Sequence, residues 1–159
     1  LPVSDAAERY ADEIRAHFDL APGEFPVFDI VQQGVGADVH TASLFPGHDW
    51  GDAPGSPDVL AVLDAPKPPP ERVSLSVARL NHSTKVWIVV TGAGKHAALT
   101  RWRQGERLPV NAVHGKTETV AWLDAAAWRG PAAGRGGTAS RTARPGDSKG
   151  GRGAGLLAR

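Results

Sequence analysis

Asp38 and His40 stand two positions apart in the glycine-rich stretch 34–47, directly after an apolar run. A histidine changes protonation near neutral pH and can act as a general base, and a carboxylate beside it can orient the imidazole. The competing interpretation is structural, with Asp38 capping a short helix and His40 serving as a polar turn residue. The residue types and their spacing leave both interpretations open.

Two nucleotide-binding motifs are incomplete in this sequence. The dinucleotide pattern G-x-G-x-x-G would need glycine where Val39 stands. The phosphate-loop pattern G-x-x-x-x-G-K-[ST] would need glycine at Val89 and Ser or Thr at His96. The six histidines form no H-x-H or H-x-x-x-H pair, and the chain has no cysteine. We therefore expect neither a nucleotide cofactor nor a metal site.

Three basic residues are candidates for binding an anion. Arg72 opens a predicted strand, Lys95 follows a Gly-x-Gly turn at the start of a predicted helix, and Lys67, a weaker candidate, lies in a proline-rich loop. Backbone amides at such a turn attract phosphate, and nearby cations add to that attraction. Isolated cations are also common on protein surfaces, so the residues alone favour solvated side chains.

The spacing of apolar residues predicts an α/β layered sheet. Strands are predicted over 26–31, 59–63, 72–77, 85–91 and 117–123, and helices over 4–18, 40–45 and 95–103. Residues 85–91 are apolar on both faces, which is typical of a central parallel strand. Ligands of such sheets bind beyond the carboxyl ends of strands, where Asp38 and His40 would lie. In the first turn of a helix, the positive end of the dipole would favour a neutral His40.

Residues 129–159 differ in composition from residues 1–128. They hold nine of the 19 glycines and seven of the 18 lysines and arginines, but one of the 17 acidic residues. Such a segment cannot bury enough apolar surface to offset its ordering entropy, so we expect a Gly/Arg-rich disordered tail after one domain at 1–128. Arginine-glycine segments can bind nucleic acid, but no folded nucleic-acid motif accompanies this one, and we do not expect that function.

No apolar run approaches the roughly 18 residues needed to span a bilayer, and no signal pattern opens the chain. We therefore expect a soluble, cytoplasmic protein. The chain has no methionine. We take this to indicate a part of a longer product.

Several segments, in consistent order, resemble the 6-phosphogluconolactonase family. They are Phe28–Val31, Gly34–Gly47, Pro66–Pro69, Arg72–Ser76, Val86–Gly92, Lys95 and Trp122–Ala127. The resemblance covers about residues 5–128. HTASLFPG and K-P-P-x-x-R-V are specific motifs within it.

The resemblance implies a three-layer α/β sandwich with a mostly parallel sheet, related to the sugar-phosphate isomerases. It implies a hydrolase that converts 6-phosphogluconolactone to 6-phosphogluconate in the pentose phosphate pathway. The histidine matching His40 is the base that activates water in this family, and the acid matching Asp38 lies beside it. The related isomerases hold the sugar phosphate with residues that match Arg72 and Lys95. The chemistry implied needs no metal or cofactor, and the partner is a small sugar-phosphate lactone.

Two alternatives stand beside this interpretation. One is an amino-sugar-phosphate isomerase or deaminase, which the SLFP that follows in residues 43–46 disfavours. The other is an inactive fragment or sugar-phosphate-binding remnant, because the family's upstream half, with its first strands and glycine-rich phosphate loop, has no counterpart in this sequence. The sequence makes no prediction of the oligomeric state.

Two positions within the matched region depart from the family pattern. Val39 stands between the acid and the histidine, where the family has glycine. If this position needs a positive φ, valine is strained there and can misplace His40. Gln32 and Gln33 replace aliphatic residues at the end of a buried strand, which costs stability unless their amides find partners.

Overall fold

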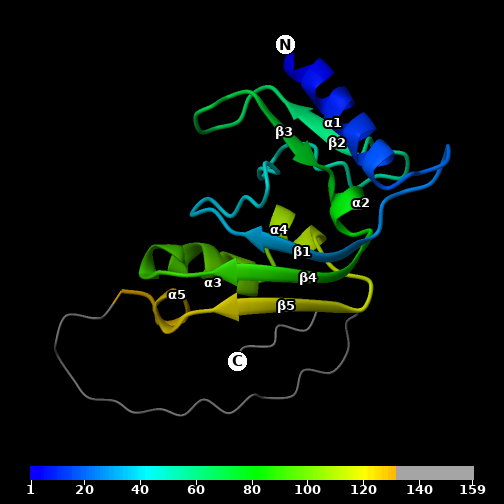
Figure 1. Ribbon diagram of the computed structural model, residues 1–159. Helices are drawn as coiled ribbons and strands as arrows, with labels where there is room; N and C mark the ends of the chain where they lie inside the picture. Colours follow the sequence, from blue (N-terminus) through cyan, green and yellow to red (C-terminus); the bar gives the residue numbers. More distant parts are fainter. Residues whose placement is uncertain (132–159) are drawn as a thin grey trace, which may run out of the picture.

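The computed structural model describes residues 1–131, which form helices and strands joined by loops (Figure 1). In chain order these are α1 Val3–His17, β1 Phe28–Gly34, β2 Val59–Val62, β3 Arg72–Leu75, α2 Val77–Leu80, β4 Ser83–Val90, the 3₁₀ turn η1 Ala93–Lys95, α3 His96–Arg103, α4 Pro109–Ala112, β5 Glu118–Leu123 and α5 Ala125–Arg129. The first residue of the predicted tail, Arg129, is thus helical. The prediction of disorder from residue 132 onward lies outside the described residues.

The main sheet is parallel, in the order β1-β4-β5. Its register places Val86 of β4 beside Val31 of β1, and Ile88 of β4 beside Ala121 of β5. The prediction of a central parallel strand over 85–91 is confirmed. β2 and β3 form a separate antiparallel pair, so the fold is mixed α/β with a mostly parallel sheet, as predicted.

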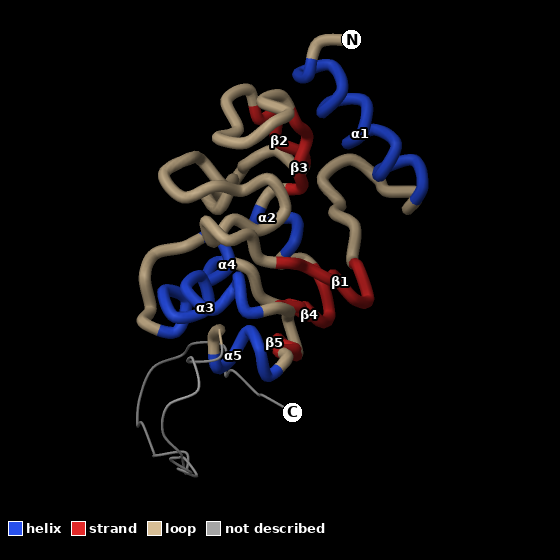
Figure 2. The backbone as a smooth tube through the Cα atoms, turned by 90° about the vertical axis from the view of Figure 1, so that its left-hand side faces the viewer, coloured by secondary structure: helices blue, strands red, loops and turns tan. Residues whose placement is uncertain are grey.

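The core lies between the main sheet and helices α3 and α4, which flank one face of the sheet (Figure 2). Alternate residues of β4, Val86, Ile88 and Val90, point into this core and are almost fully buried. Helix α1 packs instead on the β2–β3 pair, through a small cluster that includes Ile14 and Val59. The amphipathic helix predicted over 4–18 is therefore present, but only Ala7 and Ile14 are buried, whereas Tyr10 and Phe18 are exposed.

The helix predicted over 40–45 is wrong. Val39 and Ala42 have φ of +65° and +50°, which an α-helix cannot contain. Thr41 and Leu44 instead close a tight turn, with backbone N to O distances of 3.3 Å and 2.9 Å in the two directions. His40 therefore lies in a loop, and the helix-dipole argument for its neutral form does not apply.

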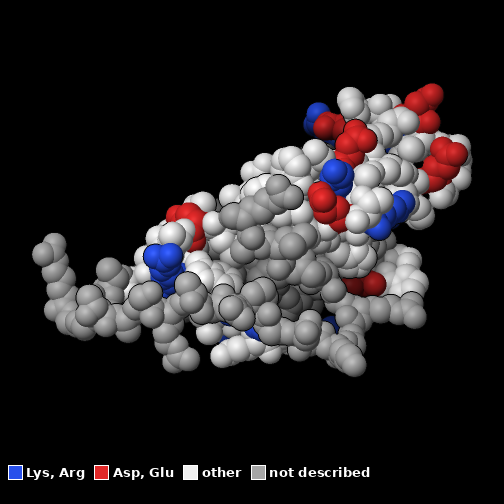
Figure 3. All heavy atoms as spheres, turned by 90° about the horizontal axis from the view of Figure 1, so that it is seen from below, with Lys and Arg blue, Asp and Glu red and all other residues white. Residues whose placement is uncertain are grey.

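No helix within residues 1–131 is long and apolar enough to cross a bilayer. Seen from the β5 side, acidic and basic side chains are intermixed at one end of the molecule (Figure 3). Across the described residues, no three His, Asp or Glu side chains gather as metal ligands would. The expectation that the chain works without metal or cofactor stays a prediction.

Candidate active site

The stretch between Gly36 and His40 forms a tight turn just after β1. The Gly36 amide donates to the His40 carbonyl at 2.8 Å, and the Val39 amide donates to the Gly36 carbonyl at 2.9 Å. Within this turn the His40 Nδ1 lies 2.5 Å from Asp38 Oδ1. The predicted pairing of the acid with the imidazole is thus present, in a half-buried position at the carboxyl end of a strand.

Gly36 lies directly against the paired side chains. A Cβ on Gly36 would stand 2.1 Å from His40 Nδ1 and 2.6 Å from Asp38 Oδ1, closer than atoms can approach. Any side chain at this position would therefore displace the imidazole or the carboxylate. The need for glycine here comes from the space that the imidazole takes.

Val39 occupies the left-handed region with φ of +65° and is fully buried. A β-branched residue in this region is strained by about 1–3 kcal/mol. Its side chain belongs to the main hydrophobic core, so burial offsets part of that strain. Val39, which stands where the family has glycine, therefore does have a positive φ. The Asp38–His40 contact forms nevertheless.

The environment of Asp38 favours its ionised form. Burial alone would raise its pKa, but the hydrogen bonds from His40 and Lys67 outweigh burial and lower the pKa below its usual value. Because a carboxylate only accepts, His40 Nδ1 carries the donated proton. In the neutral imidazole this leaves the lone pair on the other ring nitrogen, Nε2, where a general base needs it.

Arg72 lies at the start of β3, close to the pair but directed to other partners. Its Nε donates to the Pro69 carbonyl at 2.9 Å, and its Nη2 donates to the carbonyls of Lys67 and Pro68 at 2.8 Å and 3.1 Å. Its guanidinium carbon lies 5.4 Å from the ring centre of Phe45. The ring of Phe45 is in turn 4.8 Å from that of His40, so a buried aromatic ring separates Arg72 from the base.

Lys95 ends η1, just after β4, whose last residues run beside the end of β1. Its side chain is half-buried and forms no hydrogen bond or ion pair with another described residue. The expected anion cradle at the preceding turn is incomplete, because the Gly92 amide donates to the Asp124 carboxylate at 2.9 Å and 3.1 Å. Lys95 thus shares the site's edge of the sheet without touching the pair.

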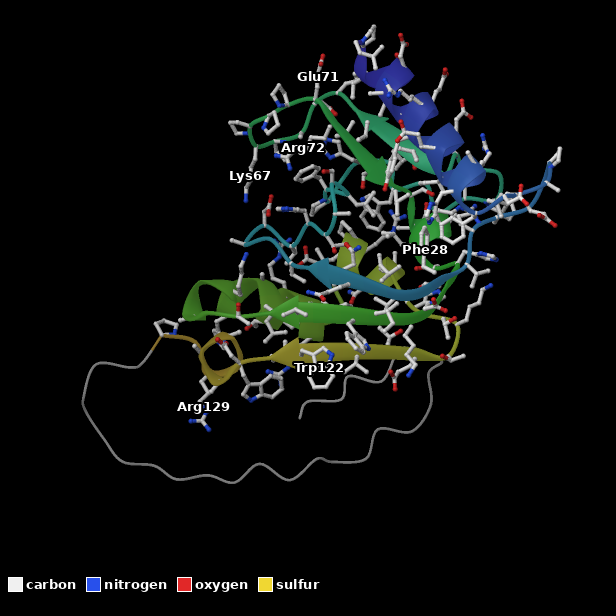
Figure 4. The ribbon with its side chains drawn as sticks, in the orientation of Figure 1. Phe28, Lys67, Glu71, Arg72, Trp122 and Arg129 are labelled. Atoms are coloured by element: carbon white, nitrogen blue, oxygen red, sulfur yellow. The ribbon has the colours of Figure 1, made fainter. Side chains whose placement is uncertain are left out.

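Three side chains near the site were missed or undervalued from the sequence. Lys67 Nζ lies 3.1 Å from Asp38 Oδ1, and Figure 4 shows it directed from the β2–β3 loop toward the loop after β1. Phe45 forms the wall between His40 and Arg72. The pKa of Arg101, on α3, is raised mainly by its pairing with Glu106 and also by the charge of Asp38.

The two glutamines that replace aliphatic residues are accommodated differently. Gln33 Oε1 accepts from the buried Thr41 hydroxyl at 3.0 Å, and the same hydroxyl lies 2.8 Å from the Gly34 carbonyl. Gln32 is exposed on the open side of the sheet. The amide oxygen of Gln33 is therefore partnered, by a residue of the turn that carries His40.

Comparison with known proteins assigns the chain to a family. The family model described as "Glucosamine-6-phosphate isomerases/6-phosphogluconolactonase" matches residues 2–122. Over 80% of its length the chain is 44% identical to the 6-phosphogluconolactonase of Rattus norvegicus and 42% identical to that of Homo sapiens. It covers 49% and 50% of those two proteins.

A solved structure agrees with the sequence matches. The crystal structure of 6-phosphogluconolactonase from Thermotoga maritima superimposes with a TM-score of 0.62 at 29% identity, covering 77% of this chain and 52% of that one. The chain therefore spans about half the length of the relatives that it matches. The resemblance stated from the sequence is confirmed: the chain belongs to the family of glucosamine-6-phosphate isomerases and 6-phosphogluconolactonases.

Proposed function

We propose that this chain carries the hydrolytic centre of a 6-phosphogluconolactonase, with His40 as general base and Asp38 as its orienting acid. The observation that supports this most directly is the 2.5 Å contact between Asp38 Oδ1 and His40 Nδ1 at the carboxyl end of β1. The names of relatives that are more than 40% identical support the substrate class.

The chemistry follows from the protonation of the pair. His40 Nε2 takes a proton from a water molecule as the water oxygen attacks the lactone carbonyl carbon, giving a tetrahedral oxyanion and an imidazolium. The ionised Asp38 stabilises that imidazolium through Nδ1. As the intermediate collapses, the ring C–O bond breaks, and the imidazolium returns its proton to the departing alkoxide. The products are a carboxylate, formed after loss of one proton to solvent, and a free hydroxyl.

The phosphate of the substrate needs cations at the same edge of the sheet. We assign this role to Lys95 and to Arg72. Lys95 contributes its unengaged ammonium, whereas Arg72 contributes Nη1, since its Nε and Nη2 already bind the proline-rich loop. A fixed guanidinium is well suited to an anion because little side-chain entropy remains to be lost. A phosphorylated substrate does not cross bilayers unaided, so a cytoplasmic location fits this proposal.

A lactone-hydrolysis assay on the purified chain tests the proposal. The rate above the spontaneous background is compared for the native chain, His40→Gln and His17→Gln, because His17 is exposed at the end of α1 and far along the chain from the site. We expect His40→Gln to lose about 100-fold or more in kcat, the usual contribution of a general base, and His17→Gln to be unchanged. Equal rates for both variants would remove His40 from the mechanism.

The non-catalytic alternative has its own outcome in a binding experiment. If calorimetry detects binding of 6-phosphogluconate while the native chain gives no hydrolysis, the chain is a sugar-phosphate-binding remnant. Hydrolysis of the lactone by the native chain excludes this non-catalytic alternative. Turnover of amino-sugar phosphates instead of the lactone would favour the isomerase or deaminase alternative.

A further inference from the structure

The proline-rich loop, defined here as residues 65–70, brings a lysine to the Asp38–His40 pair. Lys67 Nζ lies 3.1 Å from Asp38 Oδ1, the same oxygen that lies 2.5 Å from His40 Nδ1. One carboxylate oxygen therefore accepts from two donors, one on its own turn and one on a loop between β2 and β3. This arrangement limits the rotation of the carboxylate more than either contact alone.

Arg72 holds the proline-rich loop by its backbone. Its guanidinium donates to the carbonyls of Lys67, Pro68 and Pro69, at 2.8 Å, 3.1 Å and 2.9 Å. The loop is closed at its base by the Ala65 amide, which donates to the Pro70 carbonyl at 2.9 Å. Figure 4 shows Lys67 and Arg72 on the side of the loop that faces the site, whereas Glu71 points away from it.

We propose that Lys67 is a positioning residue of the site: its ammonium fixes the Asp38 carboxylate against the His40 imidazole, and Arg72 fixes Lys67 through the proline-rich loop. The catalytic consequence rests on the proposed function. The contact itself does not, because the positions of Lys67, Asp38 and Arg72 are independent of any substrate. The proposal gives Arg72 a structural task in addition to anion binding.

The charges that face Asp38 come from three places. His40 lies on its own turn, Lys67 on the proline-rich loop, and Arg101 on α3, where the charge of Asp38 contributes to its raised pKa. Removing the Lys67 ammonium removes one of the two side-chain hydrogen bonds that oppose burial, so the pKa of Asp38 should rise. Lys67 is half-exposed, so the change will be modest.

The direct test is the carboxyl titration of Asp38 followed by ¹³C NMR in the full chain, with Asp38→Asn to assign the signal. The matched control is Lys85→Met, because Lys85 is 44% exposed against 47% for Lys67 and pairs with Glu118 on the sheet. We expect the midpoint to move to higher pH in Lys67→Met, because the carboxylate loses a hydrogen bond that favours its ionised form. We expect a smaller move in the same direction in Arg72→Gln, and none in Lys85→Met.

A Lys67→Met midpoint equal to that of the native chain overturns the proposal, because the ion pair would then not persist in solution. A midpoint that moves in Lys67→Met but not in Arg72→Gln overturns the anchoring role of Arg72. Far-UV circular dichroism of each variant establishes that the fold is retained. Both outcomes are read without any enzymatic activity.

Kinetics provide the second test. We expect Lys67→Met to lower kcat by up to about fivefold with little change in KM, and Lys67→Arg to recover part of the loss. A raised KM at unchanged kcat would instead make Lys67 a substrate ligand and overturn the positioning role. If the native chain hydrolyses no lactone, the proposed function fails, while the NMR titration still decides whether Lys67 holds Asp38.

Discussion

The imidazole of His40 packs directly against the backbone of Gly36. A Cβ at Gly36 would stand 2.1 Å from His40 Nδ1, and the two residues are also joined by a hydrogen bond from the Gly36 amide to the His40 carbonyl at 2.8 Å. The position of the candidate base is therefore set by a residue with no side chain. This makes Gly36 a sharper test of the site geometry than the titrating residues themselves.

Gly36→Ala should separate the Asp38–His40 pair. The added methyl cannot fit beside the ring, so we expect a loss of about 1–3 kcal/mol in the free energy of unfolding and a loss of most lactonase activity. Gly34→Ala is the matched control, because a Cβ there meets nothing within 4 Å and its φ is not positive. Urea unfolding and the hydrolysis assay measure both variants. Native-like activity in Gly36→Ala would show that the imidazole adopts another position in solution.

At a buried site an alanine variant is usually more stable than a glycine variant, and we expect the opposite order of stability at Val39. Both truncations lose the packing of a fully buried valine, worth about 1.5–3 kcal/mol, but glycine alone relieves the left-handed strain at φ of +65°. We therefore expect Val39→Gly to be at least as stable as Val39→Ala. Urea unfolding of both variants measures this difference.

The control for that comparison is Val86, which is equally buried but lies in the middle of β4. There glycine should be less stable than alanine by about 0.5–1 kcal/mol, because a strand does not need positive φ. A Val39 pair that follows the same order as the Val86 pair would contradict the strain assigned to Val39.

The regular parts of this fold were predictable because their signals are local. Residues 85–91 are apolar on both faces, and this identifies a central strand without any long-range information. The turn after β1 was not predictable in the same way. The composition of residues 40–45 predicts a helix. Instead, Val39 is buried in the core and Thr41 and Leu44 close a turn, and Val39 and Ala42 have left-handed conformations.

The contacts of the candidate site also differ in how far they could be predicted from local sequence. Asp38 and His40 are neighbours in sequence, so their contact followed from spacing and from their place after a strand. The contact of Lys67 with Asp38 joins two loops that lie on different sheets, and no local pattern encodes it. The one available signal was the K-P-P-x-x-R-V motif, which holds Lys67 and Arg72 at the spacing that lets the guanidinium bind the lysine's own backbone.

The lowered pKa of Asp38 predicts a specific pH dependence of stability. Burial opposes this shift, and the hydrogen bonds from His40 and Lys67 produce it. A carboxyl whose folded pKa is depressed stabilises the fold fully above its unfolded pKa, near 3.8, and loses that contribution as the pH falls through the folded value. Asp38→Asn should therefore be less stable than the native chain near pH 6, with the gap closing below about pH 4.

Urea unfolding at several pH values measures that gap. The control is Asp5→Asn, an exposed carboxyl at the start of α1, measured at the same pH values. A gap between Asp38→Asn and the native chain that stays constant down to pH 3 would contradict an ionised, hydrogen-bonded Asp38.

A buried ion pair between Arg79 and Asp58 lies outside the Asp38–His40 turn. Arg79 Nε lies 2.9 Å from Asp58 Oδ1, and both side chains are at most 5% exposed. Burial lowers the pKa of Arg79, and the charge of Asp58 opposes that shift. Arg15 of α1 reaches the second oxygen of Asp58 at 3.5 Å, and the guanidinium of Arg79 lies 4.0 Å from the ring centre of Phe25.

Removing the charge of Asp58 should lower the free energy of unfolding more than removing the charge of Arg79. Asp58→Asn leaves a buried guanidinium without its counter-charge, so we expect a loss of about 3–5 kcal/mol in the free energy of unfolding. Arg79→Met leaves Asp58 paired with the half-exposed Arg15 and keeps an apolar stem against Phe25, so its loss should be smaller. Denaturant unfolding of the two variants compares them directly. If Arg79→Met is the more destabilising variant, the guanidinium contributes through contacts other than Asp58, and the buried charge is not what sets the cost.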